Sequence, residues 1–396
     1  MILIGVFSTY KYHFILNIIM KNLCIFLSLF IHFSCSQIKE KIYSNYLALP
    51  ENDNNFKTEL SYEIIENNII LFPIINGRKC RMLFDTGARS FLSSNLIDSF
   101  KLDIHSTITT KDIFQNKITT TKHLCDLSLN SLKVYDYKIT KNHSFNNECF
   151  NLDGIIGKEI LNQGVFYFNS LTKKLLISNS ISNFDLKDFQ KIKIEYYLGD
   201  IIINYQRKKY VLDSGFNNGF ILTMDNKLFN DIDSIKVQKR IVGGLHSKKT
   251  IYIKYQKHSM QIDSVKYLGT ICSSNEIHYN LFGSKWFIDN EIILDVNNKY
   301  IYIKKNNKLN TKLDSLKNIN FQFLKNNVII SSLSTKINNV NIGDTIIQIN
   351  DINLINIKSS CEFDQLLSKI NYNNGINIVT NNKKNIFFSK NQLFNY

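Results

Sequence analysis

Short apolar runs separated by asparagine, glycine and serine recur between residues 60 and 306. Runs of this length with turn residues at both ends predict β-strands. The Asn76-Gly77 pair lies between two such runs and predicts a hairpin, and one short helix is predicted at 158–161. The strands that the pattern predicts lie at 69–75, 80–84, 201–204, 210–212, 250–254 and 300–303. The fold class expected for this part of the chain is therefore all β.

The pattern changes at residue 315. Apolar runs at 321–333 and an alternating stretch at 340–350 predict strands, a helical pattern follows at 362–370, and a last strand is predicted at 375–380. We therefore expect residues 315–396 to form a separate, small α+β domain.

The first 35 residues are strongly apolar, and Lys21 interrupts them. From Met20, an alternative start, the sequence has a short basic beginning, an apolar core and a small residue before Cys35. This order resembles a bacterial lipoprotein signal, which implies export to the cell envelope, lipidation of Cys35 and a membrane tether at 36–59. An uncleaved membrane anchor over 14–33 is the alternative, although a lysine in its middle is costly.

The composition indicates a folded protein, with 44% hydrophobic residues, 12% aromatic residues and 2 Pro. A chain of 396 residues is long enough for two or three domains. The 48 Lys and Arg against 33 Asp and Glu give a net charge of +15, a value that would suit nucleic acid or an anionic membrane surface. Because the lysines are scattered and form no dense basic run, we expect no nucleic-acid partner.

Seven cysteines bear on the oxidation state of the protein. After loss of Cys24 with the signal and lipidation of Cys35, an odd number remains. The remaining cysteines are Cys80, Cys125, Cys149, Cys272 and Cys361. A disulfide between Cys125 and Cys149 is one interpretation, while burial as small hydrophobic residues is favoured for most of the set. Neither a Cys-x-x-Cys pair nor paired histidines occur, so no metal and no other cofactor is expected.

The candidate chemistry lies at Asp85, where an apolar strand ends in the small-residue turn Thr86-Gly87-Ala88. An isolated Asp-Thr-Gly is ordinary turn chemistry, but a second copy, Asp213-Ser214-Gly215, follows a similar strand. Ile155-Ile156-Gly157 ends 72 residues after the first aspartate, and Leu281-Phe282-Gly283 ends 70 residues after the second. The sequence therefore contains an internal duplication of about 128 residues per unit.

These four motifs, in this order, resemble the two half-sites of aspartic peptidases of the pepsin and retropepsin type, and more narrowly the bacterial retropepsin-like enzymes fused in tandem. The resemblance covers residues 60–306. It implies a bilobal acid-protease fold with lobes at 60–187 and 188–310, and a site complete within a monomer. Activity as an endopeptidase on peptide or protein substrates is the function it implies.

The resemblance also assigns roles to individual residues. As in aspartic peptidases as a class, Asp85 and Asp213 would share one proton and activate a water, without a cofactor or covalent intermediate. Thr86 and Ser214 would join the two loops by hydrogen bonds, and small residues would allow close approach. The site-supporting residues that it implies are Thr86, Gly87, Ala88, Ile156, Gly157, Ser214, Gly215, Phe282 and Gly283.

A peptidase of this type needs hairpin flaps that cover the substrate. Gly243 and Gly244, 30 residues after Asp213, are the candidate tip of one flap, because glycines permit movement and backbone contacts with a peptide. The corresponding place in the first unit, Gln115-Asn116, has no glycine. Plain hairpin turns are the alternative interpretation of both places.

The stretch Val340 to Asp351, with a glycine and an aspartate before an alternating strand, resembles the middle of a PDZ domain. Such domains bind an extended peptide, often the C-terminal end of another protein, as an added strand beside a helix. A small packing domain that stabilises the second lobe is the alternative.

A noncatalytic function is the alternative for the whole protein. Phe216 follows the second motif where the pepsin pattern has a small residue, and dense strands also form inert sandwiches. In that case the protein would be a surface protein that binds peptides through its C-terminal domain.

Overall fold

The computed structural model describes residues 47–48, 56–65, 67–111, 116–142, 151–216, 221–224, 235–243, 248–262, 265–277, 279–306 and 318–394. They belong to one compact unit of the protein, Leu47–Tyr396, and the other unit, Met1–Tyr46, lies outside the described residues. Strands predominate, so the prediction of a mainly β protein is confirmed. Within the described ranges, no helix has the length and apolar character needed to cross a membrane.

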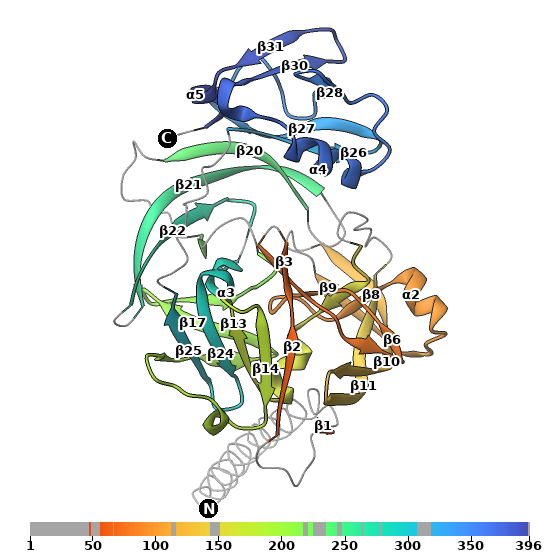
Figure 1. Ribbon diagram of the computed structural model, residues 1–396, viewed down its shortest axis with the longest axis vertical. Helices are drawn as coiled ribbons and strands as arrows, with labels where there is room; N and C mark the ends of the chain where they lie inside the picture. The colour runs from red at the N-terminus through yellow and green to blue at the C-terminus, as the bar shows by residue number, and fades with distance from the viewer. Residues whose placement is uncertain are drawn as a thin grey trace, which may run out of the picture. The chain divides into compact units, whose positions relative to one another are not determined.

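The first duplicated unit forms a mixed sheet (Figure 1). Its elements are β1 (Leu47–Ala48), β3 (Glu63–Ile65), β4 (Asn68–Leu71), β5 (Ile74–Ile75), β6 (Arg78–Lys79), β7 (Met82–Phe84), β8 (Phe91–Ser93), α2 (Ser94–Ser99), β9 (Ile104–Lys111), β10 (Lys117–Leu129), β11 (Leu132–Asn142) and β12 (Gly154–Ile156). Strand β7 lies between β4, antiparallel, and β12, parallel. Strand β8 then joins β12 to β11, antiparallel to the former and parallel to the latter.

The second unit repeats this topology. Its elements are β16 (Glu195–Tyr197), β17 (Asp200–Tyr205), β18 (Lys208–Leu212), β19 (Ile221–Leu222), β20 (Lys236–Gly243), β21 (Lys248–Ile262), β22 (Val265–Ser273), β23 (Leu281–Phe282) and α3 (Lys285–Asp289). Strand β18 lies between β17, antiparallel, and β23, parallel. Strand β19 is antiparallel to β23 and parallel to β22. The duplication in the sequence therefore corresponds to a duplication of strand order and direction.

A third sheet joins the two units. It contains β2 (Lys57–Ser61), β13 (Val165–Asn169), β14 (Lys174–Ser178), β15 (Gln190–Lys193), β24 (Asn290–Asp295) and β25 (Tyr300–Lys305), in the order β15-β25-β24-β13-β14-β2. The equivalent strands β13 and β24 pair antiparallel at its centre, with Tyr167 opposite Ile293. Two 3-10 helices, η1 (Lys158–Gln163) and η2 (Ile181–Asn183), flank this region. Residues 57–59, placed in the tether by the sequence, already belong to β2.

The C-terminal region has its own elements. These are β26 (Ile319–Leu324), β27 (Asn327–Ser334), β28 (Thr345–Ile349), β29 (Ile352–Asn353), α4 (Ser360–Ser368), η5 (Tyr372–Asn374), β30 (Ile376–Thr380), β31 (Asn385–Phe388) and α5 (Lys390–Leu393). The α+β composition predicted for this region is therefore confirmed. Its sheet continues into the second unit, because β27 pairs antiparallel with β20 (Figure 1).

Separate cores support these parts. One buried cluster contains residues of both duplicated units, including Phe84, Phe168 and Phe287, whose ring centroids lie 4.9 to 6.2 Å apart. A second cluster draws its buried members only from residues 319–393. Burial of such apolar surface is the main source of stability, so the C-terminal region supplies its own stabilising core.

Some local predictions differ from the structure. Uninterrupted strands at 69–75 and 80–84 are wrong, because β4 ends at Leu71 and β7 begins at Met82. Pro73, which has no N–H to donate, lies in the break before β5. The turn itself is confirmed: Asn76 and Gly77 have φ of 45° and 80° between the paired β5 and β6, as expected for a type I′ hairpin.

Candidate active site

Asp85 follows β7 directly, and three backbone groups orient it. Its own N–H donates to the carbonyl of Ile156 over 3.0 Å. Its Oδ1 accepts from the N–H groups of Gly87 and Ala88, at 2.9 and 3.0 Å. The strand thus delivers the carboxyl group, and the turn that follows holds one of its oxygens.

Asp213 is held in the same way after β18. Its N–H donates to the carbonyl of Phe282 over 2.8 Å. Its Oδ1 accepts from the N–H groups of Gly215 and Phe216, at 2.9 and 3.1 Å. The hydrogen bonds of the two aspartates therefore correspond one to one.

Thr86 and Ser214 connect the two loops. The N–H of Thr86 donates to Oγ of Ser214, and the N–H of Ser214 donates to Oγ1 of Thr86, both over 3.0 Å. Each hydroxyl then donates across to the opposite strand, Thr86 to the carbonyl of Leu212 at 2.6 Å and Ser214 to that of Phe84 at 2.9 Å. Both side chains are fully buried. The predicted hydrogen bonding between these two residues is confirmed.

The two carboxyl groups meet between these loops, close enough that each affects the pKa of the other. A Cβ placed on Gly87 would lie 2.5 Å from Cγ of Asp213, and one placed on Gly215 would lie 2.2 Å from Oδ2 of Asp85. Each glycine therefore lies directly against the carboxyl group of the opposite loop. The absence of a side chain at both positions is a steric requirement of this arrangement.

The environment favours a shared proton. Both residues keep some exposed surface, but protein atoms surround their carboxyl groups. Burial raises the pKa of Asp213 well above its ordinary value, and the neighbouring charge and hydrogen bond of Asp85 add to this effect. Burial also raises the pKa of Asp85, while hydrogen bonds from Asp213, Gly87, Ala88 and Gly215 oppose the rise. Two such groups titrate as a pair that holds one acid and one base.

The predicted apolar-apolar-glycine motifs pair with the strands that carry the aspartates. Ile156 and Phe282 are fully buried and lie in β12 and β23, parallel to the strands that carry Asp85 and Asp213. A Cβ on Gly157 would lie 2.4 Å from the carbonyl oxygen of Ala88. The carbonyl of Gly283 accepts the N–H of Trp286 at the start of α3. The structure thus brings all predicted supporting residues to the two loops.

Sequence reasoning missed a buried polar cluster beside the first loop. Oε2 of Glu159 accepts from the N–H and the hydroxyl of Ser90, at 2.9 and 3.0 Å. Oγ of Ser90 accepts from the N–H of Gly157 at 2.8 Å and lies 2.5 Å from Oη of Tyr137. The repeat gave no indication of this cluster, because Lys285 stands at the place of Glu159 in the second unit.

The two predicted flap positions fall at the ends of long hairpins. Gly243 is the last residue of β20 and pairs with Lys248, while Gly244 lies outside the described residues. In the first unit Asn116 precedes β10 and Gln115 lies outside the described residues. The hairpins β20–β21 and β9–β10 therefore occupy equivalent places in the two units.

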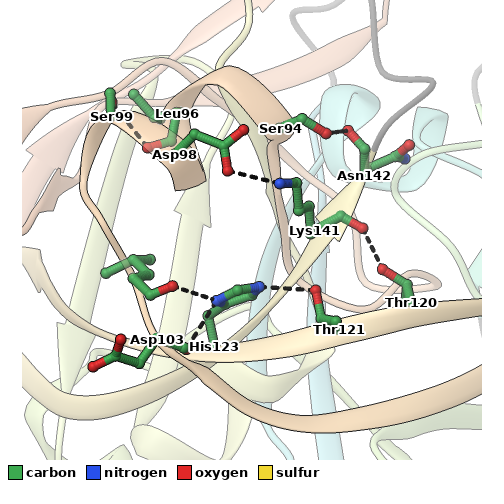
Figure 2. Close-up of polar contacts among 11 residues, drawn as sticks. Ser94, Leu96, Asp98, Ser99, Asp103, Thr120, Thr121, His123, Lys141 and Asn142 are labelled. Carbon is green, nitrogen blue, oxygen red and sulfur yellow. Dashed lines mark hydrogen bonds and ion pairs between the residues drawn. The ribbon is translucent and has the colours of Figure 1, made fainter.

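Figure 2 shows the polar contacts at the base of the first hairpin. His123, in β10, is almost fully buried, and its Nδ1 lies 3.0 and 2.9 Å from the carbonyl oxygens of Leu102 and Asp103. Because both partners are acceptors, Nδ1 carries a proton and donates. Nε2 of His123 lies 2.9 Å from the hydroxyl of Thr121. These bonds attach β10 to the segment that leads into β9.

Phe216 does not disturb the second loop. Its N–H makes the bond to Asp213 that Ala88 makes to Asp85. Its half-buried ring packs against a cluster that includes Leu222 and Leu281. The phenylalanine side chain therefore packs beside the site and leaves the hydrogen bonds of the loop intact.

The structure describes the side chains of three of the five remaining cysteines. Cys80, Cys125 and Cys272 are buried free thiols, as favoured by the sequence, and Cys149 lies outside the described residues. Burial is the main cause that raises the pKa of Cys80 to about 11 and the pKa of Cys125 and Cys272 to about 12. Such thiols are poor nucleophiles near neutral pH. Within the described ranges no group of three or more His, Cys, Asp or Glu side chains is arranged to hold a metal.

Comparisons with known proteins identify no family. No model of a protein family matches the sequence, and no curated protein matches it significantly.

Proposed function

We propose that the protein is an aspartic endopeptidase in which Asp85 and Asp213 form one catalytic pair. The observation that carries the proposal is the direct contact of the two carboxyl groups between symmetric loops. A purely structural pair of turns would not need two desolvated carboxyl groups in contact, because such contact is unfavourable when both are ionised. Perturbed carboxyl groups of this kind are typical of functional sites.

In the proposed mechanism, one member of the pair is protonated and the other is ionised. Asp213, with the pKa raised by burial and by its neighbour, holds the shared proton and donates it to the oxygen of the scissile carbonyl. Asp85, whose carboxylate accepts several backbone N–H groups, takes a proton from the attacking water. The product of this step is a neutral tetrahedral intermediate. Its C–N bond breaks as Asp85 gives the proton to the leaving nitrogen and Asp213 takes back a hydroxyl proton, which leaves a carboxylic acid, an amine and the original pair.

The wider architecture is part of the proposal. We assign residues 60–187 and 188–310 to the two lobes of a bilobal acid-protease fold, supported by the matching strand orders and by the central pair β13–β24. Residues 315–396 are assigned to a PDZ-like domain, supported by the helix α4 that packs beside the edge strand β26. A peptide substrate or a peptide C-terminus is the partner proposed for that edge.

Location is a separate proposal that depends on the N-terminal sequence. The resemblance of residues 20–35 to a lipoprotein signal supports export and membrane attachment through Cys35. Cys35→Ser should move the protein from the membrane fraction to the soluble fraction. An unchanged membrane fraction would contradict lipidation at this residue.

The experiment that tests the activity is turnover of a mixed peptide library by residues 36–396, from acidic to neutral pH. Cleavage should disappear in Asp85→Asn. Asp98→Asn is the matched control, because it removes an exposed carboxyl group that pairs with Lys141 away from the site (Figure 2). Peptide binding without cleavage at any pH, in wild type as in Asp85→Asn, would favour a noncatalytic surface binding protein instead.

A further inference from the structure

The hairpins of the two units differ in one respect. In the described residues, β9 pairs only with β10, so the outer edge of the first hairpin has no further strand. The outer strand of the second hairpin, β20, pairs with β27 of the C-terminal region. The second hairpin is therefore an inner part of a larger sheet, whereas the first is an edge.

The contact between β20 and β27 is specific. Gln238, Lys239 and Arg240 pair with Ser334, Leu333 and Ser332, in that order. Thr335 extends the contact, since its N–H donates to the carbonyl of Val237 over 3.1 Å. We call these seven residues and Val237 together the hairpin seam.

A buried side-chain bond lies within the hairpin seam. Oγ of Ser332 donates to Oε1 of Gln238 over 3.1 Å, and the two side chains are 0% and 1% exposed. Polar groups buried to this degree depend on their partners, because each loses water when the strands meet. Ser332 and Gln238 therefore favour one register of β20 against β27.

The two sides of the hairpin seam have different supports. Leu333 belongs to the core cluster of residues 319–393, so β27 is fixed by the C-terminal region itself. On the other side, Arg240 Nη1 donates to Oη of the fully buried Tyr255 in β21 over 3.1 Å, which ties β20 to its hairpin partner. If the hairpin moved, the bonds between β20 and β27 would break, because the core of residues 319–393 holds β27 in place.

We propose that the C-terminal region positions the second hairpin over the substrate, with Gln238 and Ser332 as positioning residues for peptide binding. This inference rests on the proposed peptidase function, in which the β20–β21 hairpin is a flap. It assigns the C-terminal region a role in the peptidase site itself, in addition to any peptide that its own edge binds. It also makes the two flaps unequal: one is anchored, and the other has no further strand at its outer edge among the residues that the structure describes.

The experiment uses the protein of residues 36–396 with Ser332→Ala, which removes the bond to Gln238. Amide hydrogen exchange of β20 should become about tenfold faster, since one buried hydrogen bond is lost, while β9 is unchanged. The KM for a cleaved peptide should rise about threefold or more with little change in kcat, because peptide binding depends on the hairpin. Ser332→Thr, which keeps the hydroxyl, should restore both values.

Two further variants keep the test decisive. Thr109→Ala is the matched control, because it removes the exposed 3.3 Å contact with Thr119 in the first hairpin and should leave β20 exchange unchanged. Ser332→Ala could also loosen β28 and β30, so Gln238→Leu is used to break the same bond from the hairpin side. In the double variant, β20 exchange and KM should rise no further than in the more affected single variant. Unchanged β20 exchange in both single variants, or faster exchange with unchanged KM, would overturn the inference. A wild-type protein that cleaves no peptide would instead refute the proposed function, and the exchange result would still decide whether the hairpin seam holds β20.

Discussion

Thr86 and Ser214 hold each other by a reciprocal pair of hydrogen bonds, each backbone N–H donating to the hydroxyl of the other over 3.0 Å. Each hydroxyl also donates to the strand that carries the opposite aspartate. The positions of Asp85 and Asp213 are therefore set by the same four buried bonds. A change to either hydroxyl is expected to affect both loops together.

Loss of the Thr86 hydroxyl should destabilise the protein strongly. Thr86→Val keeps the shape of the side group but leaves the N–H of Ser214 and the carbonyl of Leu212 without this partner. We expect a loss of about 2–4 kcal/mol in the free energy of unfolding, because each unsatisfied buried group costs about 1–3 kcal/mol. Urea unfolding measures the loss. Thr109→Val, at an exposed position, is the control, and an equal small loss in both variants would contradict this account.

The glycine of the second loop should tolerate no side chain. In Gly215→Ala the new Cβ would lie 2.2 Å from Oδ2 of Asp85, so the carboxyl groups would be pushed apart. Peptide cleavage should fall by at least about a hundredfold, as expected when reacting groups are displaced by about 1 Å. Gly343→Ala provides the comparison, because its φ of 90° makes the change strained although no atom lies within 4 Å. Gly343→Ala should lose stability but keep its activity per folded molecule. Full activity in Gly215→Ala, or loss of activity per folded molecule in Gly343→Ala, would contradict the steric explanation.

The candidate site could be predicted from the sequence because each of its two motifs occurs twice. Asp85 and Asp213, their glycines and the two apolar-apolar-glycine motifs appear at matching intervals, and the structure places them at the ends of matching strands. Apolar runs and alternation also predicted β26, β27, β28 and β30, whereas β29 and β31 were not predicted. The strand breaks near Pro73 were missed because periodicity over a short run does not show where hydrogen bonding stops.

Contacts that occur once could not be found by comparing the two units. Glu159 has no counterpart in the second unit, where Lys285 stands, and its partner Ser90 looks like an ordinary turn residue. The pairing of β20 with β27 joins Gln238 to Ser332 across 94 residues, and neither residue type suggests a contact. Such pairings depend on three-dimensional register, which local patterns do not encode.

Glu159 should act as a positioning residue for the first loop. Glu159→Ala leaves the buried N–H and hydroxyl of Ser90 without their acceptor. We expect a loss of about 2 kcal/mol in unfolding free energy and lower kcat at unchanged KM, because the loop that carries Asp85 loosens. Glu159→Gln keeps an acceptor oxygen and should recover most of the activity. Failure of Glu159→Gln to exceed Glu159→Ala in kcat would show that the hydrogen bond is not the cause.

Ionisation of Asp213 should lower the free energy of unfolding at high pH. The native protein binds the Asp213 proton more tightly than the unfolded protein does, because burial and the Asp85 charge raise the pKa of Asp213 well above its ordinary value. The stability that this carboxyl supplies is present at low pH and is lost as the pH rises through the raised native pKa. Asp213→Asn cannot ionise, so it should be more stable than wild type by about 1 kcal/mol or more near pH 8. The difference should shrink toward about pH 4, and urea unfolding at both values checks its sign. A difference that grows on acidification would contradict the raised pKa.

In the proposed function, Asp85 and Asp213 act as one catalytic unit. The most direct test compares kcat/KM for one cleaved peptide in Asp85→Asn, Asp213→Asn and the double variant, with native folding checked by circular dichroism. Residues that act as a unit are not additive, so we predict that each single variant loses at least about a thousandfold and that the double variant loses no more. An Asp213→Asn variant with wild-type activity, or a double variant far below both single variants, would contradict the claim.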